Sequence, residues 1–229
     1  MDARAFAELA RELAAQPDEV VTFEQVVKRA LEVVPGCTHA GVTLRTRRGR
    51  LESTATSDGV VVACDELQYE LGEGPCLEAV TEDFSYVSND LAHDDRWPRW
   101  GPRAAELGVG SVIAVQLTDT TNVLGALNMY GDGPRAFSTN DVDLAITYGI
   151  HATTAMRTAR LITGLESALR SRHDIGLAQG ILMQKFRLTP DRSFEALRRV
   201  SNDRNVPLRD LARQVVEHGG IPTAGDDPG

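Results

Sequence analysis

The amino-acid sequence predicts an α+β protein in which an antiparallel sheet with flanking helices is joined by a long helix to an all-α end of three helices. Two changes in the spacing of apolar residues support this prediction. Helical spacing holds up to Val34, short segments rich in Val, Leu and Thr begin at Ala40, and helical spacing returns from about Asn140. Strands that can pair antiparallel, mixed with helices, are typical of the α+β class.

The first part of the chain favours two helices followed by five strands. Residues 3–15 and 22–34 have apolar residues on one side, and the Thr22 hydroxyl is a suitable N-cap for the second helix. The strands are expected over residues 40–44, 51–56, 85–87, 111–117 and 123–130. The first two form a hairpin pattern around a turn that contains Gly49. Short helices are expected over residues 76–82 and 97–107.

A single helix is expected from about Asn140 to about Phe186, with Ser138 or Thr139 as its cap. A stripe along it advances by alternating steps of four and three residues, which is the heptad seam of a coiled coil between two copies. Its members are Tyr148, Ala152, Ala155, Ala159 and Ile162. The register becomes imperfect at Gly164, which weakens the helix locally, so this point marks either the join between two domains or a break.

Two short helices close the chain. Thr189 caps the first and Pro190 occupies its first helical position, while residues 205–207 end it. Its expected inner face is Phe194, Leu197 and Val200, and in the last helix we expect burial of Leu211, Ala212, Val215 and Val216. Residues 219–229 are rich in Gly and Pro and are expected to be disordered.

The net charge of −9 argues against a protein that coats nucleic acid generally, but the charge is uneven. Residues 165–217 contain ten Lys and Arg against seven Asp and Glu, so they carry +3 and the remainder carries −12. A mildly basic end on an acidic body favours a local anionic partner. No apolar run is long enough to span a membrane, and no signal segment is recognisable. Cys37, Cys64 and Cys76 lack metal-binding spacing, so we expect a cytoplasmic protein with reduced thiols, no metal and no membrane partner.

The basic end contains a specific pattern. The small-residue run Ala178-Gln179-Gly180 is followed at once by Ile181-Leu182-Met183, and further matches lie at Ala168, Leu169, Arg172, Ile175, residues 196–199, Leu211 and Ala212. This stretch resembles the ANTAR domain, an RNA-binding output module of bacterial antitermination regulators. The resemblance implies that a homodimer binds paired stem-loops in nascent RNA and blocks a terminator hairpin. Gln179 replaces a lysine that is frequent in the family.

The preceding residues resemble a GAF domain, a small-molecule-sensing or signal-sensing module. The resemblance rests on residues 71–76 (LGEGPC), Asp90, residues 96–98, 108–112 and 124–128, and Phe137-Ser138. It implies a domain over residues 18–160, followed by an ANTAR-like domain over 161–218. The pairing is familiar among actinobacterial regulators. The GAF ligand stays open, a small molecule or a redox input through Cys76 among the possibilities, and no cofactor is expected.

Basic and amide side chains of the ANTAR-like part are the candidate RNA-binding groups, since Arg and Lys contact phosphates and amides hydrogen-bond to loop bases. The candidates are Gln179, Lys185, Arg187, Arg198, Arg199, Asn202, Arg204, Asn205 and Arg209, with Arg213 beside them. No histidine lies in a recognisable catalytic motif, and the cysteine spacing does not match a thiol-dependent methionine sulfoxide reductase, so no catalytic residue is expected. The alternative is a DNA-binding or protein-interaction regulator with a degenerate GAF domain.

Overall fold

The computed structural model describes residues 8, 11–13, 15, 18–46, 48–81, 84–118 and 122–221. The chain divides into two compact units, Met1–Ile162 and Thr163–Gly229. Most of the helix expected over residues 3–15 lies outside the described residues, as does the expected tail beyond Ile221. The tail was expected to start at residue 219, which is too early. Gly219 caps the last helix, and Ile221 packs against the C-terminal core.

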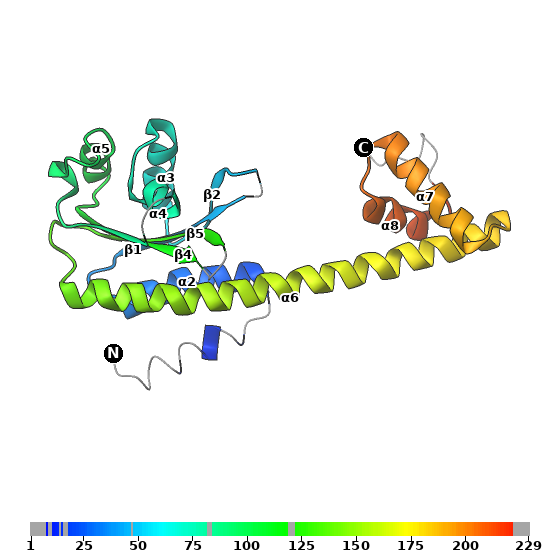
Figure 1. Ribbon diagram of the computed structural model, residues 1–229, viewed down its shortest axis with the longest axis horizontal. Coiled ribbons are helices and arrows are strands. Elements are labelled where there is room, and N and C mark those ends of the chain that lie inside the picture. Colours follow the sequence, from blue (N-terminus) through cyan, green and yellow to red (C-terminus); the bar gives the residue numbers. More distant parts are fainter. Residues whose placement is uncertain are drawn as a thin grey trace. The chain divides into compact units, whose positions relative to one another are not determined.

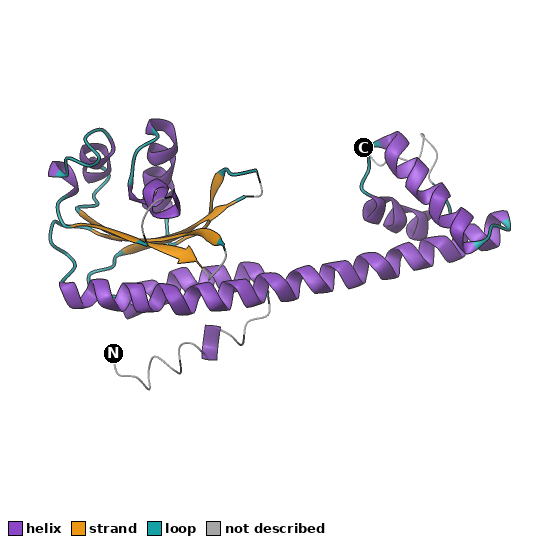
Figure 2. Cartoon of the chain, viewed as in Figure 1, coloured by secondary structure: helices purple, strands orange, loops and turns teal. Residues whose placement is uncertain are grey.

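The N-terminal unit is built on a five-stranded antiparallel sheet with the order β2-β1-β5-β4-β3. The strands are β1 (His39–Arg45), β2 (Leu51–Thr56), β3 (Ser85–Ser88), β4 (Ser111–Thr118) and β5 (Val123–Gly131). All five expected strands are therefore present. Figure 2 shows the sheet with helices on both faces, which confirms the α+β class.

Two helices cover one face of this sheet. They are α2 (Glu19–Val33) and the first half of α6 (Thr139–Phe186), which lie side by side in Figure 1. Phe23 and Val26 of α2, Tyr148 of α6 and Leu127 of β5 belong to their common core. The Tyr148 hydroxyl donates a hydrogen bond of 2.7 Å to the Val26 carbonyl, which fixes α6 against α2.

The opposite face is covered by α3 (Gly59–Leu71), α4 (Pro75–Thr81) and α5 (Trp100–Glu106), with the short 3₁₀ turn η1 (Leu91–His93). Helix α3 was not predicted from the sequence, because its Val60-Val61-Val62 run is typical of strands. Its ends carry helix signals nonetheless. The Asp58 side chain accepts from Val60 N, and Gly72 ends the helix in the left-handed conformation.

Two expected helix starts were wrong. Helix α2 begins at Glu19, because Asp18 rather than Thr22 caps it and accepts from Val21 N at 3.0 Å. Thr22 is instead buried one turn later. Helix α5 begins at Trp100 rather than Trp97, since Pro98 disfavours helical conformation in the residue before it.

Helix α6 is continuous over 48 residues and passes through Gly164 without a break. Ser138 caps it in a reciprocal arrangement: Asp141 accepts from the Ser138 backbone N–H at 2.8 Å, and the Ser138 hydroxyl accepts from Asp141 N at 3.3 Å. The expected dimer seam needs correction. Four of its five residues are buried in the chain's own N-terminal unit, because this side of α6 faces α2 and the sheet; they are Tyr148, Ala152, Ala155 and Ala159.

The C-terminal unit packs the end of α6 against α7 (Pro190–Arg204) and α8 (Leu208–His218). Its core consists of Ala178, Leu182, Leu197, Leu211, Ala212 and Val215. Thr189 and Pro190 start α7 as expected. Leu197 is buried and Val200 packs against the C-terminal core, as expected, whereas Phe194 is exposed and Ser193 and Ser201 are buried in its place. No helix in the described residues is long and apolar enough to cross a membrane.

Candidate functional sites

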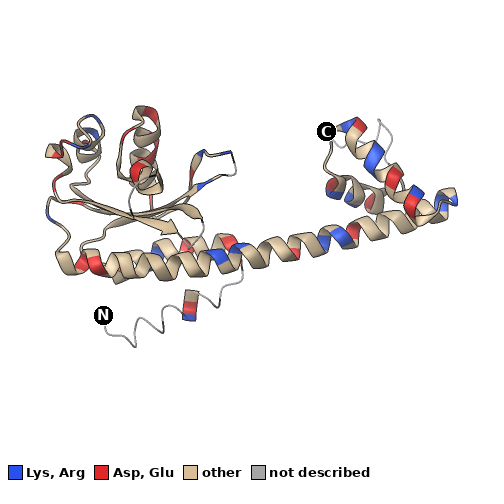
Figure 3. Cartoon of the chain, viewed as in Figure 1, with Lys and Arg blue, Asp and Glu red and all other residues tan. Residues whose placement is uncertain are grey.

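The candidate RNA-binding side chains of the C-terminal unit lie on its surface, with the exception of the half-buried Gln179. Figure 3 shows Lys and Arg positions distributed along the end of α6, α7 and α8, interleaved with Asp and Glu. The structure separates them into two grooves and a set of turn positions. The predicted surface is therefore not one continuous patch.

The first groove follows the outer side of α7 and has a volume of about 700 Å³. It brings together Arg198, Arg199 and Asn202, as the sequence predicted, and adds Arg192, which the sequence analysis overlooked. Glu195 and Asp203 also line it. Neither Arg198 nor Arg199 forms an ion pair within the described part of the chain, so both guanidinium groups are available to an anion.

The second groove lies between α6 and α8 and measures about 470 Å³. Arg209 and Arg213 line it, together with Arg170 from α6, whose place in the site no sequence motif signals. Asp210 lies 3.6 Å from Arg209 and 3.5 Å from Arg213, and it offsets part of their charge. Asp174 also lines this groove, so each groove combines three arginines with two acidic residues, and the ion pairs with Asp210 distinguish this one.

Two candidate residues have structural contacts. Gln179 Nε2 donates to the Pro190 carbonyl at 3.1 Å and thereby connects α6 to the start of α7. Lys185 Nζ donates to the Gly219 carbonyl at 3.2 Å, at the C-terminal end of α8, where a positive charge is favourable. An RNA contact by either side chain would compete with these bonds.

Turn geometry positions two further candidates. Arg187 follows the end of α6 with φ of 54°, and Asn205 ends α7 with φ of 52°. Asn tolerates the left-handed conformation better than most residues, which explains its use as a helix C-cap. Arg204 precedes it on the exposed end of α7.

A second site lies inside the N-terminal unit, between α3 and the sheet. The carboxyl group of Asp65 is almost fully buried there, and four side chains from three strands point their donors at it. Ser53 donates at 2.5 Å, while Thr43 and Asn128 lie at 3.4 Å and Tyr130 at 3.5 Å. Burial raises the pKa of Asp65 to about 6, although these hydrogen bonds lower it in part.

Two amide groups beside Asp65 have buried atoms without a hydrogen-bond partner among the described residues: Gln68 Nε2 and Asn128 Oδ1. Gln68 lies one helical turn after Asp65 and faces the same side of α3. Its other atom, Oε1, accepts from Cys76 N at 2.8 Å, so the orientation of the amide is fixed. Buried polar atoms are nearly always satisfied in proteins, so these two are notable.

The three cysteines are free and buried. Burial raises the pKa of the Cys37, Cys64 and Cys76 thiols to about 12 each. A reactive cysteine needs thiolate character and access to solvent, and these thiols have neither. This argues against redox sensing by Cys76 and against the reductase alternative. The described residues also contain no cluster of His, Cys, Asp and Glu suited to a metal ion.

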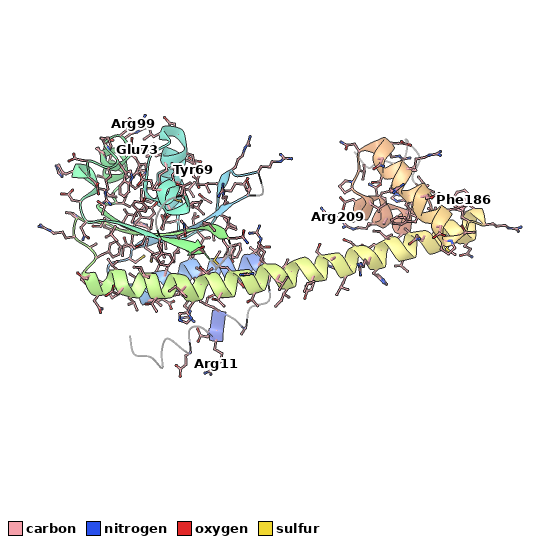
Figure 4. The ribbon with its side chains drawn as sticks, in the orientation of Figure 1. Arg11, Tyr69, Glu73, Arg99, Phe186 and Arg209 are labelled. Carbon is pink, nitrogen blue, oxygen red and sulfur yellow. The ribbon has the colours of Figure 1, made fainter. Side chains whose placement is uncertain are left out.

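The Gly-rich segment before α4 is a structural turn. The Glu73 carboxylate accepts from the backbone N–H of Arg99 at 2.7 Å and of Trp100 at 2.9 Å, and from the Arg99 side chain at 2.9 Å. Tyr69, Glu73 and Arg99 lie on the side of the sheet away from α2 and α6 (Figure 4). Trp97 and Trp100 are fully buried beneath this turn and belong to the core.

Gly74 is essential to this turn, and Gly74→Ala is expected to lower the free energy of unfolding of the N-terminal unit by about 2–4 kcal/mol. Gly74 has φ of 143°, and an added Cβ would overlap the Gln68 side chain. Urea unfolding followed by tryptophan fluorescence measures the change. Gly59→Ala is the matched control, because an added Cβ meets nothing there. Equal stabilities of the two variants would contradict the role of Gly74.

The fold and the two sites define a chain with an α+β domain enclosing a polar interior and a three-helix domain bearing exposed arginines. The chain belongs to the GAF-domain family, whose model matches residues 16–157, and residues 163–216 match the ANTAR domain. It therefore joins a GAF sensor domain to an ANTAR RNA-binding antitermination domain, an architecture typical of regulators that are not enzymes.

Solved structures resemble the N-terminal part of the chain. The GAF domain of a phosphoenolpyruvate-protein phosphotransferase from Coxiella burnetii is 17% identical, with a TM-score of 0.55 over 70% of this chain and 95% of that one. The GAF domain of the cyanobacteriochrome TePixJ is 15% identical, with a TM-score of 0.52 over 65% and 95%. A free methionine-R-sulfoxide reductase from Neisseria meningitidis, solved with its substrate, is 15% identical, with a TM-score of 0.52 over 68% and 87%. At these identities the likeness shows the fold alone. No curated protein matches the chain.

Proposed function

We propose that this protein is a cytoplasmic, dimeric antitermination regulator of the kind found in actinobacteria, whose C-terminal unit binds paired RNA stem-loops when its GAF domain receives a signal. The observation that carries the proposal is the α7 groove, in which Arg198, Arg199 and Asn202 line one surface of an ANTAR domain. Guanidinium groups suit phosphate oxygens, and an amide suits the edge of an unstacked loop base.

Dimerisation is proposed through a different side of α6 from the one the sequence indicated. Leu161, Leu165 and Leu169 are 63%, 57% and 65% exposed and are spaced one helical turn apart. A row of exposed leucines is costly in water unless another surface covers it. A second copy of the same helix would cover this row with an identical one, which is how symmetric dimers bury apolar residues.

The leucine row predicts that Leu161→Glu with Leu169→Glu converts a dimer into a monomer. Light scattering of the full chain across the micromolar range measures the mass. Val62→Glu with Leu107→Glu serves as the control, since both residues are exposed and apolar but lie elsewhere in the N-terminal unit. A wild-type chain that is monomeric both alone and with RNA would rule out this part of the proposal.

Signal transfer is proposed to pass through α6, because this helix contributes to the cores of both domains. Its first half includes Tyr148 and Ala152 of the N-terminal core, and its last turns include Ala178 and Leu182 of the C-terminal core. A change in the GAF interior that shifts the sheet against α6 would reach the same helix that holds α7 and α8. The exposed leucines lie between these two segments.

A gel shift with the purified full chain tests RNA binding. The probes are a tandem stem-loop RNA, the same RNA with scrambled loops, and a DNA duplex of matching sequence. Loop-dependent binding of the RNA is expected, because amide contacts read unpaired bases. Binding of the DNA duplex in preference to the RNA would support a DNA-binding regulator instead.

A further inference from the structure

The turn between β1 and β2 is strongly basic, although the unit that contains it is acidic. Residues 45–50 read Arg-Thr-Arg-Arg-Gly-Arg, so they hold four of the 14 Lys and Arg residues of Met1–Ile162, which also contains 24 Asp and Glu. Figure 3 shows Lys and Arg positions at this turn. A concentration of one sign of charge creates a local positive potential, which attracts anions.

The arginines of this turn have no carboxylate partner. Arg45, Arg48 and Arg50 are exposed, and none of them forms an ion pair within the described part of the chain. Five other arginines of the same unit each lie 2.6–3.6 Å from a carboxylate oxygen; they are Arg29, Arg96, Arg99, Arg103 and Arg160. The guanidinium groups of the turn are therefore available to an anion from outside the chain.

Glu52 follows the turn but does not neutralise it. The strand register places Glu52 opposite Leu44 and Arg45 opposite Leu51. Residues that lie opposite each other share a face of the hairpin, and successive residues of a strand point to opposite faces. Glu52 and Arg45 therefore lie on different faces.

Hydrogen bonds between Thr46 and Arg50 close the turn. Thr46 N donates to the Arg50 carbonyl at 2.7 Å, and Arg50 N donates to the Thr46 hydroxyl at 3.1 Å. Gly49 has φ of 80°, a conformation that glycine adopts without steric cost. Arginines anchored on a closed hairpin lose less conformational entropy on binding than those of a flexible tail.

Protection of the sheet edge does not account for these arginines. Strand β2 is an edge strand, and charged residues along such a strand often prevent its pairing with another sheet. The exposed residues of β2 itself are Glu52, Ser53 and Thr54. The arginines lie instead in the turn and at the end of β1, where they leave the edge of β2 uncovered.

We propose that the β1–β2 turn binds the phosphate backbone of RNA, in the unpaired segments that extend beyond the stem-loops held by the C-terminal unit. Guanidinium groups match phosphate oxygens through paired hydrogen bonds. Residues 45–50 contain no aromatic side chain on which a base could stack, so the contact depends on charge and not on RNA sequence.

This inference rests on the proposed function and adds a second RNA contact to it. A transcript bound by the C-terminal unit raises the local concentration of its own flanking strand around the rest of the chain. A few arginines that would bind free RNA weakly then contribute measurably to the affinity for the whole transcript.

A gel shift with the full chain compares the tandem stem-loop RNA with the same RNA extended by about 15 unpaired nucleotides on each side. The extensions are expected to tighten wild-type binding about tenfold at about 0.15 M salt. Arg48→Ala with Arg50→Ala is expected to lose this gain, to reduce the salt slope for the extended probe by about 1.4, and to bind the shorter probe as wild type does. The control Arg103→Ala with Arg135→Ala removes the same charge from exposed positions elsewhere on the unit and should keep the gain.

An unpaired RNA strand without stem-loops separates this inference from the proposed function. A chain with Arg198→Ala and Arg199→Ala is expected to bind this strand at about 0.05 M salt, and adding Arg48→Ala with Arg50→Ala should weaken the binding at least tenfold. If the strand binds in this way but the stem-loops do not, the proposed function is wrong and the turn still binds RNA. An equal gain from the extensions in wild type and in the turn variant, or no gain in either, would overturn the inference. Tighter binding of a polyglutamate peptide than of the RNA strand would overturn it as well, because the turn would then suit an acidic protein.

Discussion

Replacing Asp65 by Asn is expected to raise the free energy of unfolding of the N-terminal unit at pH 7.5 by about 2–3 kcal/mol. Asn has almost the same shape but needs no counter-charge, so the variant avoids the cost of burying a carboxylate. The magnitude follows from the pKa of Asp65, which burial raises from 3.8 to about 6, since each pKa unit corresponds to about 1.4 kcal/mol. Removal of a buried polar side chain usually destabilises a protein, so a gain in stability would be diagnostic.

The stability gained by Asp65→Asn is expected to increase with pH. Between about pH 4 and pH 6 the folded chain keeps a proton on Asp65 that the unfolded chain has lost, so wild-type stability falls as the pH rises through this window. Other carboxyl groups act oppositely: hydrogen bonds from Arg96 lower the pKa of Asp94 to about 2, and its contribution is lost only at still lower pH. The difference between variant and wild type isolates Asp65, and it should be near zero at pH 4 and constant above pH 7.

Urea unfolding at several pH values, followed by tryptophan fluorescence, provides the measurement. Asp95→Asn is the control, because Asp95 is exposed and its replacement removes the same charge. A difference that does not vary with pH would mean that Asp65 is not the group that titrates. A variant less stable than wild type at pH 7.5 would mean that the ionised carboxylate is well solvated or paired in the folded chain.

The sequence predicted the strands and the long helix well, because their signals are local. Short apolar segments between turn residues mark the strands, and the cap at Ser138 and the helical spacing after Asn140 mark α6. Helix α3 was missed because Val60-Val61-Val62 favours a strand on propensity alone. In the structure Asp58 caps the start of α3 and Gly72 caps its end. A search of the sequence for such paired caps would have found this helix.

Which surface an apolar stripe covers is a question that spacing does not answer. The stripe from Tyr148 to Ala159 was interpreted as a seam between two copies, but Tyr148, Ala152 and Ala155 belong to the core that α2 and the sheet of the same chain form. A heptad and a helix packed on its own domain place apolar residues at nearly the same intervals. Only the tertiary structure distinguishes these two kinds of helix packing. It also shows that the side of α6 left exposed in the single chain contains Leu161, Leu165 and Leu169.

The candidate sites were predictable to different degrees. Arg198 and Arg199 of α7 were found because surface charge is visible in a basic segment, whereas Arg170 joins its groove only through the packing of α6 on α8. The polar interior of the GAF domain gave no local signal. Asp65, Thr43 and Asn128 are separated by more than 20 residues in sequence, and only the pairing of β1 with β5 beneath α3 brings them together.

Arg198→Ala with Arg199→Ala is expected to weaken binding of the tandem stem-loop RNA by about 10- to 100-fold at 0.15 M salt and to flatten its salt dependence. Each phosphate contact contributes roughly 0.7–0.9 to the slope of log affinity against log salt, because bound counterions are released. Loss of two contacts should reduce the slope by about 1.5. Asn202→Ala should instead reduce discrimination against scrambled loops and leave the slope unchanged, since an amide reads bases rather than charge.

The matched control is Arg48→Ala with Arg50→Ala, which removes the same charge from the exposed β1–β2 turn of the other domain. Arg209→Ala with Arg213→Ala should have a smaller effect than the α7 pair, because Asp210 already offsets the charge of those two arginines. Titrations at four salt concentrations separate these cases. If the slope falls equally for the control and the α7 pair, the attraction is a property of the overall charge. If the slope changes only for the Arg209 and Arg213 pair, the groove between α6 and α8 is the RNA site and α7 is not.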